Sequence, residues 1–200
     1  MIVLGISTSS RRPSAAVMRD GEIVSSFNDM SGRSHSAVLM ELIEKALSEA
    51  GIEKTELEAV AVDIGPGSFT GVRIGVSCAN AMAFALSIGV IPVCSLAAMR
   101  NIGNDEGAAA VFIDCRNGNC YAAVYVNGEL KAGPMPAVTD EVLASLPDDA
   151  RIIGDINGRN DSPSAELVLF EAARGDIKPI REAVPMYLRP SQAERMRKPD

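Results

Sequence analysis

The chain has 200 residues, is 47% hydrophobic and 22% charged, and carries a formal net charge of −7. This is the composition of a globular protein that can bury a core, and it excludes a disordered chain. The sequence has no long basic run, which argues against direct reading of a nucleic-acid sequence.

The first half predicts strands that alternate with helices. In chain order we expect a strand over 1–6, a hairpin over 14–26, a helix over 34–50, a strand over 57–65, a helix over 68–88 and a strand over 89–93. The hairpin turns at Asp20-Gly21, because both residue types tolerate positive φ. The first helix is expected to be capped by Ser34 and stopped by Gly51.

The second half repeats this plan. We expect a strand over 108–114, a hairpin over 120–131, a helix over 139–146, a strand over 150–156 and a helix over 164–175. A shift of 107 residues places Asn127-Gly128 on the first hairpin turn and Asp114 on Ser7. Two β-β-β-α-β-α units in tandem predict a duplicated α/β fold with a cleft between two lobes. The expected lobes are residues 1–100 and a reduced lobe over 101–200 that ends in an extended tail.

The Gly65-Pro66-Gly67 turn allows two interpretations. It precedes Ser68, an expected helix cap, and a helix N-terminus presents free N–H groups that suit a phosphate or carboxylate. Many strand-to-helix turns of this kind bind nothing, and neither G-K-[ST] nor G-x-G-x-x-G follows. Binding of an anion or nucleotide at Gly65, Gly67 and Ser68 therefore stays open, as does the alternative of a purely structural turn.

Carboxylates at strand ends are the other candidates for a ligand. Asp63, Asp114 and Asp155 each lie at the end of a predicted strand, and Asp114 is the best placed to join an anion or nucleotide site through Mg²⁺. Such residues also often accept backbone N–H groups alone. His35 is the sole histidine, which leaves no two-histidine metal site and no Ser-His-Asp set unless His35 serves. We expect no catalytic residue, no metal and at most weak nucleotide binding.

The second helix is almost uncharged. From 69 to 88 its only charge is Arg73, and 74–93 carries no charge across 20 residues, so a membrane span has to be weighed. Interior polar residues and the abundance of alanine favour a buried helix without a membrane. Gly71, Gly75, Ala79 and Ala83 form a row of small residues that permits close approach of another helix. A helix that is apolar all round must be covered on every side, by the chain's own lobes or by a partner.

A family resemblance rests on "GPGSFTGVRIG" at 65–75. This segment resembles the hallmark of the TsaB (YeaZ) family, a glycoprotease-like group within the actin-like ASKHA superfamily. "VLGISTS", "HSAVLMELIEKAL", "DCRNGNCYAAVY" and "PMYLRP" resemble other family segments in the same order. The resemblance implies a duplicated actin-like, ribonuclease H-like fold with mixed sheets and a reduced second lobe.

The family implies a role in bacterial tRNA modification, the formation of N6-threonylcarbamoyladenosine at position 37. It implies a non-catalytic cytoplasmic subunit that pairs with the catalytic homologue TsaD, works with the ATPase TsaE, reaches tRNA through the complex and forms a homodimer when alone. Family interfaces use the first two helices. The expected partner face is Leu39, Leu42, Ile43, Ala46, Val72, Val76, Ala79 and Ala83.

Two other functions remain as alternatives. An ATP-dependent phosphotransferase of the sugar-kinase type would need carboxylates that converge on Mg²⁺, and Ser7 stands where the family commonly has Asp. A peptidase, the older label of such sequences, would need a nucleophile, a base and an orienting group, and no such set is indicated.

Overall fold

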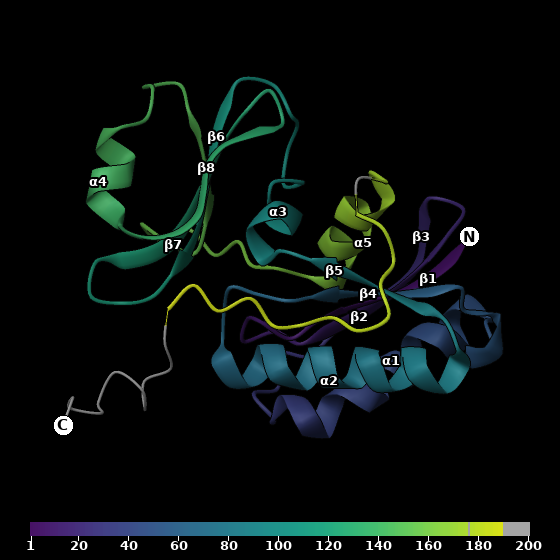
Figure 1. The fold of residues 1–200 in the computed structure, drawn as a ribbon. Helices are drawn as coiled ribbons and strands as arrows, with labels where there is room; N and C mark the ends of the chain where they lie inside the picture. Colours follow the sequence, from purple (N-terminus) through teal and green to yellow (C-terminus); the bar gives the residue numbers. More distant parts are fainter. Residues whose placement is uncertain (176, 190–200) are drawn as a thin grey trace.

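The computed structural model describes residues 1–175 and 177–189, which form two sheets with helices packed around them (Figure 1). The first half contains β1 (Ile2–Ser7), β2 (Ser14–Arg19), β3 (Glu22–Asn28), α1 (His35–Ala50), the short 3-10 turn Lys54–Glu56, β4 (Ala59–Asp63), α2 (Phe69–Leu86), β5 (Gly89–Val93) and α3 (Ser95–Met99). The second contains β6 (Ala108–Asp114), β7 (Asn119–Val126), β8 (Glu129–Val138), α4 (Thr139–Ala144), β9 (Arg151–Gly154) and α5 (Ala165–Ala173).

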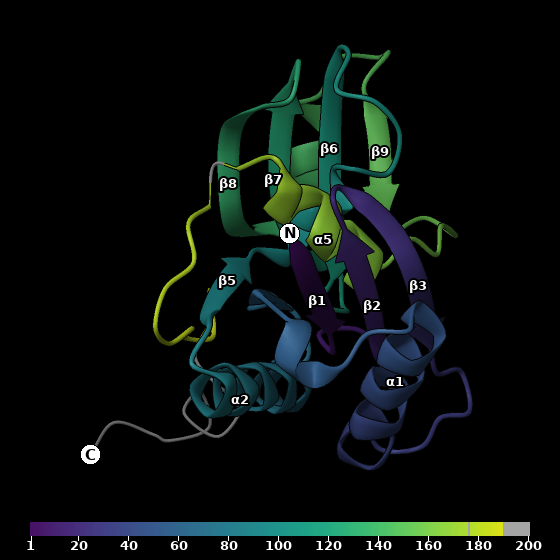
Figure 2. The ribbon, with the colours of Figure 1, turned by 90° about the vertical axis from the view of Figure 1, so that its right-hand side faces the viewer.

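The second sheet repeats the topology of the first without a counterpart of β5, which confirms the predicted duplication. The first sheet has the order β3-β2-β1-β4-β5 and the second the order β8-β7-β6-β9 (Figure 2). In the first sheet, β1 pairs antiparallel with β2 and parallel with β4. In the second sheet, β6 pairs antiparallel with β7 and parallel with β9. Both hairpin turns have two positive φ angles, 53° and 89° at Asp20-Gly21 and 50° and 76° at Asn127-Gly128.

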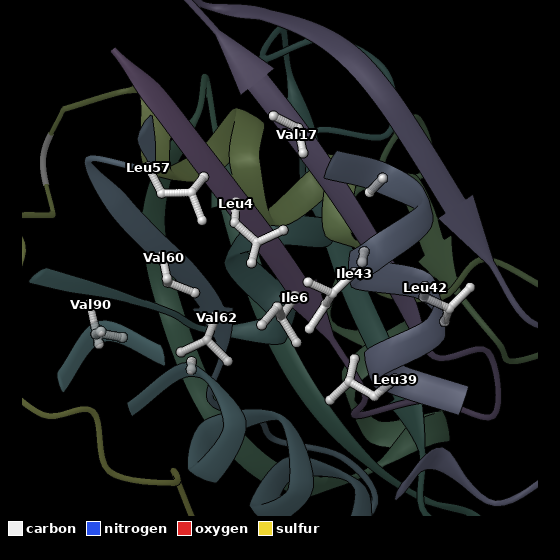
Figure 3. Close-up of a cluster of buried hydrophobic side chains, with 14 of the residues drawn as sticks. Leu4, Ile6, Val17, Leu39, Leu42, Ile43, Leu57, Val60, Val62 and Val90 are labelled. Atoms are coloured by element: carbon white, nitrogen blue, oxygen red, sulfur yellow. The ribbon is translucent and has the colours of Figure 1, made fainter. Parts of the chain in front are cut away.

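Helices α1 and α2 cover one face of the first sheet. α1 packs on β2 and β3, while α2 packs on β4 and β5. Their inward side chains join those of the strands in one cluster, in which Leu39 and Ile43 of α1 lie beside Leu4, Ile6 and Val17 (Figure 3). Burial of this apolar surface is the main force that holds the two helices to the sheet.

Helix α5 covers the opposite face of the first sheet (Figure 1). Its Val168 and Leu169 share a cluster with Val3 and Ala61. A Cβ at Gly5 would lie 2.6 Å from Cγ of Leu169, so glycine lets the helix approach β1 closely. The sequence assigned this helix to the second lobe. That assignment is wrong, because α5 packs on strands of the first sheet. Those strands are buried on both faces and need a second helical layer.

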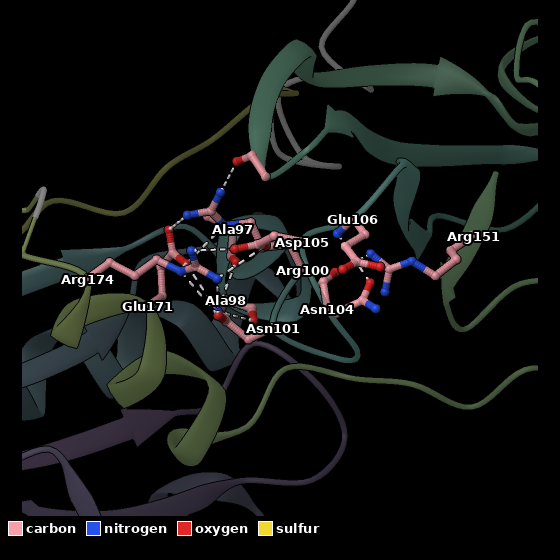
Figure 4. A network of polar contacts seen from close by, with 11 residues as sticks. Ala97, Ala98, Arg100, Asn101, Asn104, Asp105, Glu106, Arg151, Glu171 and Arg174 are labelled. Carbon is pink, nitrogen blue, oxygen red and sulfur yellow. Dashed lines mark hydrogen bonds and ion pairs between the residues drawn. The ribbon is translucent and has the colours of Figure 1, made fainter.

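A polar network joins the lobes around α3, a helix that the sequence analysis did not predict (Figure 4). Arg100 pairs with Glu171 of α5 at 3.1 Å, and these side chains are only 12% and 9% exposed. Arg100 also donates to the carbonyl of Gly128 in the second sheet's hairpin. Arg174 pairs with Asp105 of the linking segment at 2.8 Å. The network therefore connects α3, α5, the link and the second sheet.

The segment from Lys178 to Arg189 contains no helix and runs back along the first lobe (Figure 1). The sequence predicted an extended tail from Pro179 but not this contact with the first lobe. Ile180 forms two 2.8 Å backbone hydrogen bonds with Val90, and Asn80 bonds both backbone groups of Ala183 at 2.9 Å. The segment thus lines the β5 side of the sheet above α2. The rest of the predicted tail, residues 190–200, lies outside the described residues.

Candidate functional site

A cleft of about 940 Å³ lies between the lobes. Its walls are the β1–β2 loop, the Gly-Pro-Gly turn with the start of α2, the β6–β7 loop, the segment after β9 and the end of the described chain. Of the four residues that the sequence proposed for an anion, Gly67, Ser68 and Asp114 line this cleft. Gly65 is buried and is not among the lining residues.

Asp63 is fully buried at the end of β4, and its hydrogen bonds connect several segments below the cleft. Its carboxylate accepts hydrogen bonds from the hydroxyls of Ser7 at 2.8 Å, of Ser9 and of Ser95, and from the N–H of Gly65 at 2.9 Å. Burial raises the pKa of Asp63, and these hydrogen bonds act against that rise. The residue therefore ties β1, its loop, the glycine turn and α3 to one point, and it is not an open ligand in the cleft.

The Gly-Pro-Gly turn is packed against the β1–β2 loop. Gly65 has φ 97°, a conformation suited to glycine. The N–H of Ser68 donates to the carbonyl of Ser9 at 2.7 Å, and the Ser68 hydroxyl accepts from Gly71 at 3.2 Å, which confirms the expected cap. A Cβ at Gly67 would lie 2.6 Å from the Ser9 carbonyl oxygen. The glycines thus let the turn and the loop touch; anion binding there stays a prediction.

The two glycines in the row of small residues on α2 also meet this loop, and a Cβ at Gly71 would lie 3.2 Å from Nδ1 of His35 at the start of α1. A Cβ at Gly71 would lie 2.0 Å from the Thr8 carbonyl oxygen, and one at Gly75 would lie 2.3 Å from the Thr8 hydroxyl. That hydroxyl donates to the Gly71 carbonyl at 2.7 Å. These two glycines therefore serve contact within the chain.

The eight side chains expected at a partner interface point inward. Each is at most 6% exposed and belongs to the core on the sheet: Leu39, Leu42, Ile43, Ala46, Val72, Val76, Ala79 and Ala83. Their assignment to a partner surface is wrong, because on both helices they form the stripe that faces the strands. The sequence of α2 offered little guidance, since apolar residues occupy its outer side as well.

The outer side of the two helices carries exposed apolar groups instead. Phe84 is 79% exposed and Met40 45%, and Cys78 of α2 lies 3.8 Å from the Met40 sulfur. Ala81 and Ala85 are also exposed on α2. We call this surface the outer face, defined as Met40, Cys78, Ala81, Phe84 and Ala85. By length and composition alone, α2 could also cross a membrane, but its inner row packs on the sheet.

The carboxylates of the cleft are bound into its loops. Asp155 accepts the N–H of Asp114 at 2.7 Å, Asp114 accepts that of Arg116 at 2.8 Å, and Asp161 accepts that of Gly154 at 3.1 Å. In the part of the chain that the structure describes, no three His, Cys, Asp or Glu side chains gather as a metal site. His35 lines the cleft beside the start of α2.

Sequence reasoning missed the arginines of this cleft. Arg11 and Arg12 come from the β1–β2 loop, Arg116 from the β6–β7 loop and Arg189 from the end of the described chain. They are far apart in the sequence, and only the Arg11-Arg12 pair gave a local signal. At the rim, Arg73 lies 3.9 Å from the ring centre of Phe69 and donates to the Tyr187 hydroxyl at 2.7 Å.

Comparison with known proteins identifies families and single proteins that this chain resembles. Residues 28–146 match the family model described as TsaD, tRNA N6-adenosine threonylcarbamoyltransferase. The tRNA threonylcarbamoyladenosine biosynthesis protein TsaB of Escherichia coli is 30% identical, over 94% of this chain and 95% of its own.

A solved structure, YeaZ from Pseudomonas aeruginosa, has the same fold, with a TM-score of 0.73 and 27% identity over 94% of this chain and 99% of its own. A second Pseudomonas aeruginosa structure, described as similar to peptidase YEAZ, gives 0.75 with the same identity and coverage. The predicted duplicated α/β fold is thereby shown to be that of the YeaZ structures. The chain belongs to the TsaB (YeaZ) family of tRNA threonylcarbamoyladenosine biosynthesis proteins.

Proposed function

We propose that this chain is a non-catalytic subunit of the bacterial cytoplasmic complex that forms threonylcarbamoyladenosine on tRNA. Its partner is a TsaD-type homologue, and a TsaE-type ATPase acts in the same complex. The similarity to the Escherichia coli protein over nearly the whole length of both chains supports the pathway. The partners and the lack of catalysis are inferred from the surface and the cleft.

The outer face is the observation that carries the proposal. On α2, Phe84 projects with 79% of its surface exposed, next to the small side chains of Ala81 and Ala85. The Phe84 side chain is therefore accessible to another protein, and aromatic residues are enriched in the centres of protein interfaces. Exposure of such a surface in a monomer is unfavourable, so association with another chain would stabilise it.

The shared fold supports a TsaD-type homologue as the chain that covers this face. The matching family model is that of the transferase itself, and it spans both α1 and α2. A TsaD-type protein therefore carries a corresponding helix pair, and two related surfaces can meet about a pseudo-twofold axis. The same geometry permits two copies of this chain to pair through the outer face when the partner is absent.

The cleft supports a role without catalysis. Ser7 donates to Asp63, and the three aspartates that line the cleft accept backbone N–H groups. A phosphotransferase would use such carboxylates to hold Mg²⁺ and nucleotide, and here they are engaged in the loops. We expect at most weak binding of a nucleotide.

The proposal is tested by reconstitution. The chain, the TsaD-type homologue and the TsaE-type ATPase of one organism are mixed, and the mass of the complex and the modification of a tRNA transcript are measured, with threonylcarbamoyl-adenylate supplied. We expect a complex of this chain with the homologue and modification that requires both. Modification or ATP turnover by this chain alone, or full activity without it, would contradict the proposal.

A further inference from the structure

Four arginines surround the cleft although the chain as a whole is acidic. Arg11 and Arg12 approach from the first lobe, Arg116 from the second and Arg189 from the end of the described chain. The formal net charge is −7, so most of the surface repels a polyanion. The cleft brings cationic groups from three separate segments together, beside three aspartates, in a protein that is acidic overall.

Three of these arginines have no acidic partner within residues 1–175 and 177–189. No carboxylate there pairs with the guanidinium of Arg11, Arg12 or Arg116, whereas Arg33, Arg100 and Arg174 each form an ion pair. Arg189 donates to the side-chain oxygen of Asn119 at 3.3 Å and lies over the ring of Tyr121. The cleft arginines thus keep donors available for an external anion.

The four arginines of the cleft outnumber its three aspartates, and no ion pair among the described residues joins the two sets. Asp114, Asp155 and Asp161 each accept a backbone N–H within their own lobe. Guanidinium groups with free donors match the paired oxygens of a phosphate, to which arginine binds with two parallel hydrogen bonds. The chemistry of the cleft therefore indicates a ligand that carries phosphate groups.

An aromatic surface stands at the rim of the same cleft. The rings of Phe69 and Tyr187 stack with centres 4.8 Å apart, and Arg73 fixes both from α2. Tyr187 is 45% exposed and lines the cleft. Proteins that bind single-stranded nucleic acid combine a positive groove for the backbone with aromatic rings on which bases stack. Phosphate binders without bases need no such ring.

We propose that this cleft binds a single-stranded segment of RNA directly, with Arg11, Arg12 and Arg116 on its phosphodiester groups and Tyr187 against a base. The inference rests on the proposed function, which supplies a tRNA loop as the strand. It goes beyond that function, which needs only contact of tRNA with the complex as a whole. The strand would lie between the lobes of this subunit, away from the outer face.

The test compares two double variants with the same change in charge. R11Q/R116Q removes one cationic group from each wall of the cleft. R19Q/K54Q removes two exposed cations elsewhere, where Arg19 bonds the Ala50 carbonyl and Lys54 pairs with Glu44. Binding of an unmodified tRNA transcript is measured by fluorescence anisotropy at several salt concentrations. The isolated chain and its complex with the TsaD-type homologue are both measured, after thermal unfolding has shown that each variant is folded.

We expect R11Q/R116Q to weaken binding about tenfold and to flatten the salt dependence by roughly 1.5 in the log–log slope, as two lost phosphate contacts would. Tyr187→Ala should weaken it about fivefold or more, with an unchanged slope. R19Q/K54Q should bind like the unmodified chain. Equal loss in both double variants, or no tRNA binding by the unmodified chain in either form, would overturn the inference.

A further outcome separates RNA from a free nucleotide. If ATP binds the cleft and R11Q/R116Q abolishes that binding while tRNA binding is unchanged, the inference is wrong. Failure of the proposed function can be told apart from this outcome, because the chain without substitutions would then form no complex with the TsaD-type homologue. The isolated chain would still show whether the cleft arginines bind RNA.

Discussion

The hydroxyl of Ser7 donates a 2.8 Å hydrogen bond to the buried carboxylate of Asp63, from the end of one central strand to the end of its parallel neighbour. Ser9, Ser95 and the N–H of Gly65 complete the shell of that carboxylate. A second carboxylate at position 7 would face the first in a buried site, where like charges repel strongly. Serine at position 7 therefore lets the ends of β1 and β4 be connected by a hydrogen bond.

We expect Asp63→Ala to destabilise the fold by about 3 kcal/mol or more, because it leaves several buried donors without an acceptor. Ser7→Ala removes a single donor and should cost about 1 kcal/mol. Denaturant unfolding measures both free energies. Similar losses in the two variants would show that Asp63 does not hold these strand ends together.

The contact between α2 and the β1–β2 loop predicts an order of effects at two glycines. Gly71→Ala forces a methyl group onto the Thr8 carbonyl oxygen, which belongs to the backbone and cannot rotate away. Gly75→Ala meets the Thr8 hydroxyl, a side-chain group that can move. Overpacking typically costs 1–3 kcal/mol, so we expect about 3 kcal/mol for the first change and clearly less for the second. Thermal unfolding of the two variants checks the order; the reverse order would contradict the described contact.

The link between the lobes predicts a dependence on pH. The hydrogen bond from Arg174 lowers the pKa of Asp105 below its usual value. The pair therefore stabilises the fold above the pKa of the unfolded chain, near 4, and this contribution is lost as the pH falls through the lower folded value. Because Asp105 is 41% exposed, the contribution at neutral pH should be only a few tenths of a kcal/mol.

Asp105→Asn provides the comparison for this pair. Its unfolding free energy should lie slightly below that of the unmodified chain at about pH 7, and the two should converge between about pH 5 and 3. Urea unfolding over that range measures the difference. A difference that stays constant with pH would mean that the Asp105 charge contributes nothing.

Local patterns predicted the elements of the fold well. The Asp20-Gly21 and Asn127-Gly128 turns fixed both hairpins, and the cap at Ser68 and the stop at Gly51 gave the helix ends to within one residue. These signals depend on the conformations that single residues allow. The matching order of strands followed, because the two halves repeat the same pattern.

Packing between elements could not be predicted in this way. Periodicity shows that α5 is apolar but not which sheet it covers, and α3 has only five residues, too few for a period. Both sides of α2 are apolar, so its inner row could not be told from its outer face. The arginines of the cleft meet only after three segments fold together.

The central claim, that the outer face binds a TsaD-type homologue, is tested most directly by two matched substitutions. Phe84→Glu places a charge on the outer face, and Phe170→Glu makes the same change on α5, where the ring is 44% exposed on the other side of the first sheet. Calorimetric titration with the homologue should show affinity at least about thirtyfold weaker for Phe84→Glu, as expected for a central aromatic residue, and unchanged affinity for Phe170→Glu. Equal affinity of the folded Phe84→Glu variant and the unmodified chain would contradict the claim.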